Sequence, residues 1–577
     1  MRDFSYYEMR AFLYEREVEN MVEFKLLELE SIWFCDRKNV KRKLKKYEQE
    51  GRFRYDPGIG RGNLSRLTFA RTFQDEVEQA VLACVNNDQL EDIIRFLQLP
   101  VPKSWIAEVS KEVQQLFGLH SPDHEKDILR TIVMNKVSTL DPLAASITLE
   151  RYCIQQLGDT LVVYDPITEE VRPHLAYRWI SENNHSSWTF YLRKGVRFHH
   201  HRTLTSEDVV YTFRRFQGEK APMRWLVQDI QEMECLSPYV VRLRLNRPNL
   251  LFPRYLCACN LSILPKDEPF AEHKWIGTGP FRLKKRSDTL IVLEAFDQYF
   301  LERPFLDEVE LYLASEEATE AMIYLNKDHA PHDPASLKED VLNKFRYLAF
   351  NFRKSPVVRE LKFREALYHL LDMDQMRVDL GRESLVAASS FVPWKSSLPI
   401  KSRDEAKRLL AQSGYEGERL TLYANNVPQE REEARWFAEM AAAEGISVDC
   451  VYFHMKDFYD RSMDHAADFI FMGESASADP YLSILDSFYN DSLIYRRFLS
   501  EEHIRTIDRM LEGFKIEPDK TERERWINRI ESYVRNEHLI LFRYHPVFNR
   551  AIPAIIQNIR SADHGYDDFR KSWIEHL

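Results

Sequence analysis

The strongest constraint on this chain is a basic segment inside an otherwise acidic sequence. Between Ser31 and Thr72, twelve Lys or Arg residues stand against four Asp or Glu residues, which gives this segment a net charge of +8. The whole chain has 80 basic and 91 acidic residues and a net charge of −11, so the remaining residues together carry −19. Its 577 residues also suffice for several domains. The charge distribution therefore indicates a small basic module joined to a larger acidic part.

A cationic helix is expected in the middle of the basic segment. Asp36 is a good N-cap and Gly51 a good C-terminal stop, and the residues between them are rich in helix formers. At about 100° per residue, one side of this helix is apolar, with Val40, Leu44 and Tyr47. The opposite side carries Lys38, Arg42, Lys45, Lys46 and Gln49. A solvated surface helix would show the same pattern, so this helix alone does not establish a nucleic-acid contact.

The segments on both sides of this helix fit a winged helix-turn-helix. Residues 26–33 form an apolar-rich helical stretch that a short link joins to the basic helix. Residues 53–55 and 67–69 are short runs of strand formers, separated by turn-forming residues at 56–63. In such a fold the second helix enters a major groove of duplex DNA and the hairpin touches the backbone or minor groove. Residues 1–120, including connector helices, are therefore expected to form a DNA-binding domain.

Specific side chains are expected to contact the DNA. Lys38, Asn39 and Arg42 are the candidates for base edges, because arginine suits guanine and asparagine suits adenine. Phosphate contacts are expected from five further basic residues, which are Lys43, Lys45, Lys46, Arg61 and Arg66.

The acidic part reads as a mixture of helices and strands. Residues 128–133, 189–192 and 209–213 are rich in strand formers, and residues 364–371 and 404–412 have helical spacing. The expected class is therefore α/β multidomain.

Composition and short motifs limit the function and the compartment. The seven cysteines are scattered, with no CxxC pair, which argues against a disulfide framework or zinc ribbon. No signal-peptide pattern opens the chain, and the most apolar stretch, 250–264, is too short and interrupted to span a bilayer, so a cytoplasmic protein without membrane contact is expected.

No catalytic or metal-binding motif is evident. The chain has no nucleophile elbow, no Walker A loop and no HExxH motif, so no enzymatic activity, cofactor or metal is expected. Three adjacent histidines, His199 to His201, read as a surface turn. On a strand at most His199 and His201 would share an ion, and further ligands are not apparent.

Several motifs of the acidic part occur in the order found in one known family. Residues 188–199 read WTFYLRKGVRFH and residues 204–213 read LTSEDVVYTF. Further landmarks lie, in the family's order, at residues 138–142, 173–176, 277–283, 348–351, 364–367, 406–415 and 479–480. This pattern closely resembles the family 5 extracytoplasmic solute-binding proteins, which serve ABC importers. The resemblance implies a two-lobed, periplasmic-binding-protein-like (type II) domain over residues 121–577, with lobe one at about 121–350 and 530–577 and lobe two at about 351–529.

The same resemblance suggests a ligand-binding residue. Peptide binders of this family hold the peptide amine with an aspartate shortly before an Asp-Pro pair, and Glu474 stands approximately there. Glu474 is thus the candidate contact for a small solute, a peptide or a sugar derivative. A solvated loop acid is the alternative.

The front segment has a resemblance of its own. Residues 34–44, FCDRKNVKRKL, and 60–69, GRGNLSRLTF, resemble the winged-helix domain of SgrR-like transcriptional regulators, which join that domain to a family 5 domain. The resemblance implies a solute-responsive regulator that binds a duplex DNA operator. RNA polymerase and a second copy of the chain are kept as candidate partners. Two alternatives stay open: a solute-binding protein of an ABC transporter system without a DNA-binding role, and a structural adaptor that binds neither DNA nor solute.

Overall fold

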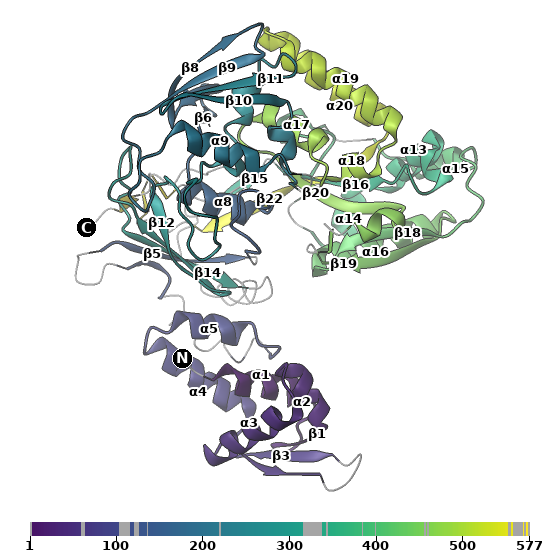
Figure 1. Ribbon diagram of the computed structural model, residues 1–577. Coiled ribbons are helices and arrows are strands. Elements are labelled where there is room, and N and C mark those ends of the chain that lie inside the picture. The colour runs from purple at the N-terminus through teal and green to yellow at the C-terminus, as the bar shows by residue number, and fades with distance from the viewer. Residues whose placement is uncertain are drawn as a thin grey trace. The chain divides into compact units, whose positions relative to one another are not determined.

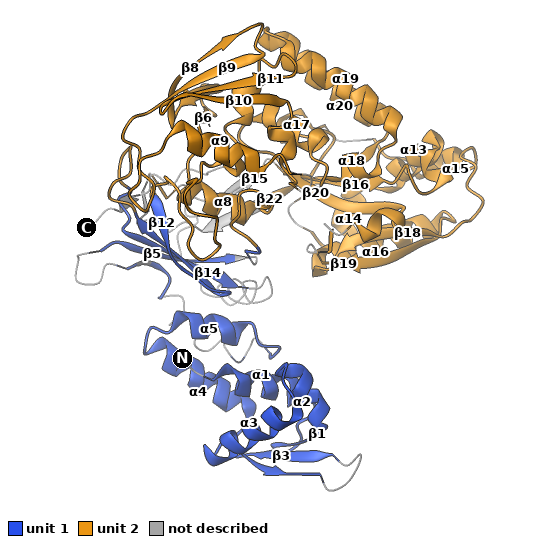
Figure 2. Cartoon of the chain, viewed as in Figure 1, with its two compact units in different colours: residues 1–138, 281–295, 304–334 blue, residues 139–280, 296–303, 335–577 orange. Residues whose placement is uncertain are grey.

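The protein divides into two compact units, which Figure 2 colours separately. The first unit comprises Met1–Ser138, Phe281–Ala295 and Pro304–Pro334, and the second comprises Thr139–Pro280, Phe296–Arg303 and Ala335–Leu577. The computed structural model describes residues 3–58, 64–102, 105, 116–120, 126–134, 137–218, 221–314, 337–341, 344–382, 385–397, 400–454, 457–458, 461–551, 556–557, 569–570 and 573–574. The expected α/β class is confirmed.

The N-terminal part of the first unit is a winged helix-turn-helix (Figure 1). Its elements are α1 Phe4–Leu13, η1 Tyr14–Arg16, β1 Met21–Phe24, α2 Leu26–Ile32, α3 Arg37–Gln49, β2 Phe53–Asp56, β3 Ser65–Phe69, α4 Phe73–Val85 and α5 Leu90–Leu97. The strands form an antiparallel sheet in the order β1-β3-β2. The backbone N–H of Tyr55 donates to Glu48 Oε1 at 2.9 Å, which attaches the hairpin to the end of α3.

A buried arginine organises the centre of this module. The Arg10 side chain is fully buried, and its guanidinium lies 3.8 Å from the centroid of the Phe69 ring. It forms ion pairs with Glu17 at 2.7 Å and Glu76 at 3.0 Å and donates to the carbonyl of Arg71. Buried charge requires such compensation, so Arg10 joins α1, the end of β3 and α4 into one core.

The first unit also contains a five-stranded sheet in the order β12-β13-β14-β5-β4. Its strands are β4 Gly118–His120, β5 Ile128–Met134, β12 Phe281–Arg286, β13 Leu290–Ala295 and β14 Glu308–Ala314. β5 and β14 are parallel and the other pairs are antiparallel. The strand expected at residues 128–133 is confirmed as β5.

The first half of the second unit is built on a four-stranded antiparallel sheet, β10-β11-β9-β8, and a small hairpin, β6-β7. These elements and their helices are α8 Thr148–Leu157, β6 Val162–Asp165, β7 Glu170–Pro173, β8 Ala176–Glu182, β9 Ser187–Leu192, α9 Ser206–Arg215, η3 Arg224–Leu226, β10 Ile230–Ser237, β11 Val240–Leu245, α10 Phe252–Tyr255 and η4 Cys259–Leu261.

One expected strand in this region is wrong. Residues 209–213 lie within helix α9, because a capping arrangement starts the helix before them. The Thr205 N–H donates to Asp208 Oδ2 at 2.8 Å, and Val209, Val210 and Phe213 then fall on a buried face at helical spacing. The strand expected at residues 189–192 is confirmed as part of β9.

The second half of this unit contains a mixed sheet in the order β19-β18-β20-β16-β21 and a smaller sheet, β15-β22-β17. Its helices are α12 Pro356–Arg359, α13 Leu361–Leu370, α14 Met373–Asp379, η7 Pro393–Lys395, α15 Arg403–Leu410, α16 Pro428–Ala443, η9 Ser462–His465, α17 Pro480–Tyr489, α18 Ile494–Phe498, α19 Glu501–Ile516 and α20 Lys520–Asn536. Its strands are β15 Leu337–Val341, β16 Lys344–Phe350, β17 Leu385–Ala387, β18 Leu420–Asn425, β19 Val448–Phe453, β20 Phe469–Ser475, β21 Ile540–Phe542, β22 Tyr544–Ala551, β23 Ile556–Gln557 and β24 Trp573–Ile574. α13 and α15 confirm the two expected helices. No helix within the described ranges has the length and hydropathy needed to cross a bilayer.

Candidate nucleic-acid interface and solute site

Helix α3 presents a cationic face opposite its buried face. Asp36 caps the helix by accepting from the Asn39 N–H at 2.8 Å. Val40, Leu44 and Tyr47 are buried, as the periodicity predicts, and each has a relative exposure of 1% or less. The opposite face is exposed, as expected, and its basic residues are Lys38, Arg42, Lys45 and Lys46.

Several cations on α3 have no acidic partner among the residues that the structure describes. Lys38, Lys41, Arg42 and Lys45 are exposed, and no carboxylate of the described ranges lies within ion-pair distance of them. Lys41 belongs to the same basic run and was missed as a candidate site residue, although its spacing from Lys45 and Lys38 could have indicated it. Uncompensated charge on an exposed helix face is available for phosphate oxygens and base edges.

Two other expected phosphate contacts are engaged within the module. The Lys43 ammonium donates to Ser5 Oγ at 3.2 Å and lies 4.9 Å from the centroid of the Trp33 ring. Lys46 pairs with Asp3 at 2.8 Å, and this hydrogen bond raises the pKa of Lys46. A phosphate contact by Lys46 would compete with that ion pair, so its role in DNA binding stays a prediction.

The remaining predicted DNA contacts differ in their surroundings. Asn39 is half-buried on the flank of α3, and its backbone serves the helix cap. Arg66 on β3 pairs with Glu23 of β1 at 2.8 Å, with about half of each side chain exposed. Arg61 lies outside the described residues.

Helix α5 attaches the winged helix to the five-stranded sheet of the same unit. Glu91 accepts from Ser287 Oγ at 3.0 Å and from Lys285, and Gln98 Nε2 donates to the carbonyl of Leu313 at 3.1 Å. Side chains of the sheet belong to the same apolar core as α5, and these are Leu290, Val292, Tyr312 and Ala314. The module therefore shares a core with strands far away in the sequence.

The second unit contains an acidic cluster at the predicted solute residue. Glu474 lies on β20, is partly buried, and accepts from the Tyr347 hydroxyl at 2.7 Å and the Ser487 hydroxyl at 2.5 Å. Burial raises the pKa of Glu474 to about 7, although these two hydroxyl donors oppose the shift. The nearby charge of Asp486 adds to the increase. Whether Glu474 contacts a solute stays a prediction.

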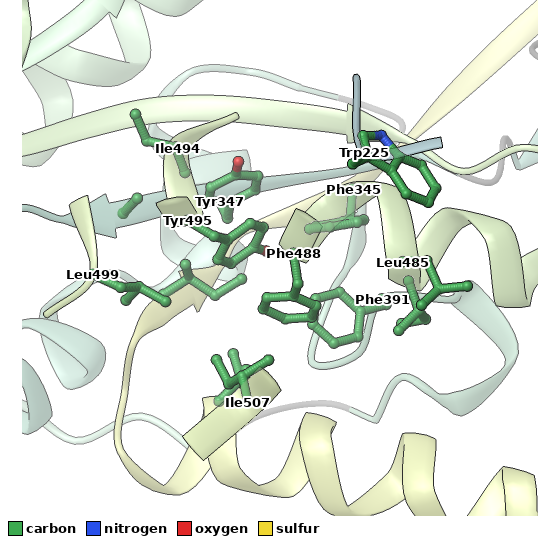
Figure 3. Packing of buried hydrophobic residues seen from close by; sticks show 14 of the residues in the cluster. Trp225, Phe345, Tyr347, Phe391, Leu485, Phe488, Ile494, Tyr495, Leu499 and Ile507 are labelled. Carbon is green, nitrogen blue, oxygen red and sulfur yellow. The ribbon is translucent and has the colours of Figure 1, made fainter. Parts of the chain in front are cut away.

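Asp486 on α17 connects this cluster to residues earlier in the chain. The indole N–H of Trp225 and the amide of Asn490 each donate to Asp486 Oδ1 at 3.0 Å. Tyr347 stacks on Tyr495 at 5.9 Å between ring centroids, and Figure 3 shows both rings and Trp225 among apolar side chains. Sequence reasoning missed Trp225 and Asp486, because only the fold brings residues 261 positions apart together.

Comparison with known families explains this combination of modules. A family profile described as bacterial extracellular solute-binding proteins, family 5 (middle part), matches residues 170–495, which is more than half of the chain. The chain belongs to family 5 of the bacterial extracellular solute-binding proteins. In this family 5 protein, a second profile, described as the N-terminal part of a sugar transport-related sRNA regulator, matches residues 5–117. The resemblances noted in the sequence are therefore both confirmed.

Two relatives align with this chain over nearly its whole length. The family 5 chain is 28% identical over 579 residues to the uncharacterized protein YhjP of Bacillus subtilis, with 97% of each chain covered. It is 23% identical over 581 residues to the HTH-type transcriptional regulator SgrR of Yersinia pestis, again with 97% of each covered.

Solved structures support the family 5 fold. The periplasmic binding protein DppA from Helicobacter pylori, in complex with the peptide STSA, matches with a TM-score of 0.68 and 20% identity, over 78% of this chain and 98% of DppA. The murein tripeptide binding protein MppA from Escherichia coli matches with a TM-score of 0.67 and 20% identity, over 78% of this chain and 99% of MppA. At these identities the likeness concerns the fold, and it confirms the type II solute-binding architecture.

Proposed function

We propose that this family 5 protein is a DNA-binding transcriptional regulator whose solute-binding domain senses a small solute. The observation that carries the proposal is the exposed cationic face of α3, where Lys38, Arg42 and Lys45 have no acidic partner in the described part of the chain. The wing next to this helix and the full-length similarity to proteins named SgrR support the same function. A regulator acts on DNA, so the proposal includes a cytoplasmic location and no enzymatic role.

In this proposal α3 enters a major groove. Lys38, Asn39 and Arg42 contact base edges, because they lie in the N-terminal half of the helix, which approaches the bases in helix-turn-helix proteins. Lys45 contacts a phosphate, and it has no ion pair in the described part of the chain that this contact would have to break. Lys43, Lys46, Arg61 and Arg66 are proposed phosphate contacts as well, and Lys46 and Arg66 would exchange Asp3 and Glu23 for phosphate oxygens.

The proposed solute carries a cationic group, such as the amine of a peptide or an amino sugar derivative. Glu474 and Asp486 provide two neighbouring carboxylates, to which the buried side chains of Tyr347 and Trp225 respectively donate. Asp486 also lies 3.6 Å from the Arg151 guanidinium, so the solute's cationic group would share Asp486 with Arg151. An ammonium group favours the ionised form of Glu474, so solute binding would release its proton near neutral pH. The solute must bind the closed form of the two-lobed domain more tightly than the open form, since a ligand without this preference shifts no equilibrium.

The attachment of α5 offers a route from solute to DNA. Strands β12, β13 and β14 belong to the unit that contains the winged helix, and the chain passes into the other unit between Ala295 and Pro304. Glu91 and Gln98 hold α5 to β12, β14 and the β12–β13 turn. A change in the solute-binding lobes would reach these strands through the chain itself.

Footprinting of the purified full chain on genomic DNA tests the proposal. A regulator protects a small number of discrete sites, and addition of candidate amine-containing solutes changes the protection. A solute-binding protein without a DNA-binding role protects no site but gains thermal stability with its solute. A structural adaptor shows neither response. RNA polymerase and a second copy of the chain remain predicted partners, and a gel-shift assay on the protected sites would reveal them as complexes of lower mobility.

A further inference from the structure

Phe34, in the turn between α2 and α3, combines two unfavourable properties. Its side chain is 95% exposed, and its backbone has φ of 46°, in the left-handed region that L-residues with large side chains rarely adopt. A single exposed phenylalanine needs no explanation by itself. An exposed phenylalanine in this strained backbone conformation does need an explanation, because its side chain gains no burial that would offset the strain. Backbone strain of this kind concentrates at functional sites.

The hydrogen bonds around Phe34 show which residue type the turn favours. The Cys35 N–H donates to the carbonyl of Glu30 at 3.2 Å, and the Trp33 N–H donates to the carbonyl of Leu29 at 3.0 Å. The bond from Cys35 to Glu30 has the spacing of the longer bond of a Schellman motif, in which the residue between the helix end and the donor is left-handed and usually glycine. Trp33 is buried and donates through Nε1 to the carbonyl of Ser5, so the turn is fixed on its inner side. Phe34 therefore occupies a glycine position.

The location of Phe34 suggests what the side chain does. It lies two residues before Asp36, the N-cap of α3, and the exposed basic residues of α3 begin at Arg37. In helix-turn-helix proteins the N-terminal end of the recognition helix reaches the base edges in the major groove. The apolar feature of that groove is the C5 methyl group of thymine, and phenylalanine is among the side chains that contact it.

We propose that Phe34 contacts a thymine methyl group at the edge of the DNA site and so contributes to sequence specificity. This inference rests on the proposed DNA-binding function. It goes beyond that function because it names a contact residue outside the cationic face, Phe34, and names thymine as the base that Phe34 reads. Because the contact is apolar, it adds discrimination between thymine and the other bases but no salt dependence.

Binding-site selection from a random duplex pool, followed by affinity measurements, tests the inference with the full chain. Phe34→Gly removes the side chain and relieves the backbone, so the expected result is a higher melting temperature together with about tenfold weaker binding to the selected site. Phe12→Ala is the matched control, because Phe12 lies on α1 and is 51% exposed. This control should change neither the affinity nor the selected sequence.

Replacement of the selected thymine by deoxyuridine isolates the methyl group. For the unmodified protein the affinity should fall about three- to fivefold, the factor that corresponds to burying one methyl group. For Phe34→Gly the same replacement should have no effect. The inference is overturned if Phe34→Gly keeps both the affinity and the thymine preference of the unmodified protein. If the unmodified protein selects no sequence at all, the proposed function fails rather than this assignment.

Discussion

Arg130 of β5 donates from both terminal nitrogens to the carboxylate of Asp88, at 2.9 Å each. Asp88 lies in the turn before α5, so this pair joins the winged helix to the five-stranded sheet. The Nε of the same guanidinium donates to Glu310 of β14 at 3.0 Å, and Glu310 also accepts from the Tyr312 hydroxyl. Arg130 and Glu310 are mostly buried, whereas Asp88 is half exposed.

Substitution of Arg130 should therefore cost more stability than substitution of Asp88. Arg130→Met leaves Glu310 without its charged partner, and the free energy of unfolding of the first unit should fall by about 1–3 kcal/mol. Asp88→Asn removes an exposed pair and should cost about 0–1 kcal/mol. Amide hydrogen exchange of α4, α5 and β5 measures both values. Equal effects of the two substitutions would contradict the role assigned to Arg130.

Arg10 should be essential for the stability of the winged helix. Arg10→Met removes the shared partner of Glu17 and Glu76, which are both mostly buried, and should lower the free energy of unfolding of this module by about 3–5 kcal/mol. Arg16→Met is the control, since the ion pair between Arg16 and Glu28 is partly exposed and should be worth about 0–1 kcal/mol. Amide hydrogen exchange over residues 3–97 measures the loss of unfolding free energy in both variants. A decrease of similar size for the two variants would show that Arg10 does not hold the core together.

Glu474 should make the stability of the second unit depend on pH. Its pKa is about 7 in the folded protein, above the ordinary value of 4.5. The folded form therefore binds the proton more tightly than the unfolded form. The stabilisation that this proton provides is fully present below pH 4.5 and is lost as the pH rises through 7.

The comparison with Glu474→Gln measures that contribution. The unfolding free energy of the unmodified protein, relative to Glu474→Gln, should fall between about pH 5 and pH 7.5. Glu405→Gln serves as the control, because a hydrogen bond from Arg408 lowers the pKa of Glu405 and its titration lies below this window. Denaturant titrations at a series of pH values provide the data. If the difference in unfolding free energy between the unmodified protein and Glu474→Gln stays constant from about pH 5 to pH 7.5, the raised pKa of Glu474 is contradicted.

Local patterns explain how much of this fold the sequence could predict. The cap at Asp36 and the spacing of Val40, Leu44 and Tyr47 predict the buried and cationic faces of α3, because both signals lie within a few turns of one helix. The strand expected at residues 209–213 is wrong, since a short run with valine and phenylalanine fits either a strand or a helix, and the cap formed by Thr205 and Asp208 decides between them.

Contacts between distant residues could not be predicted in this way. The partners of Lys46 and Arg66, which are Asp3 and Glu23, lie about forty positions earlier in the chain. The hydroxyls that Glu474 accepts from belong to β16 and α17. The domain boundary near residue 120, between the DNA-binding and solute-binding domains, stays a prediction. The structure groups residues 281–295 with the N-terminal part in one compact unit, which the sequence does not indicate. Such pairings depend on the tertiary fold, and no local periodicity encodes them.

The salt dependence of duplex DNA binding tests the central claim most directly. The full chain should bind its selected site with log Kobs falling linearly with log salt concentration. Replacement of Lys38, Arg42 and Lys45 by glutamine should weaken this binding and reduce the slope by about 0.9 for each phosphate that the variant no longer neutralises. A triple control with the same change in net charge, at Lys362, Lys395 and Lys407 in the second unit, should keep the affinity and the slope. Equal slopes for the α3 variant and the unmodified protein, or no binding by the unmodified protein at low salt, would contradict the assignment of α3 as the DNA-reading helix.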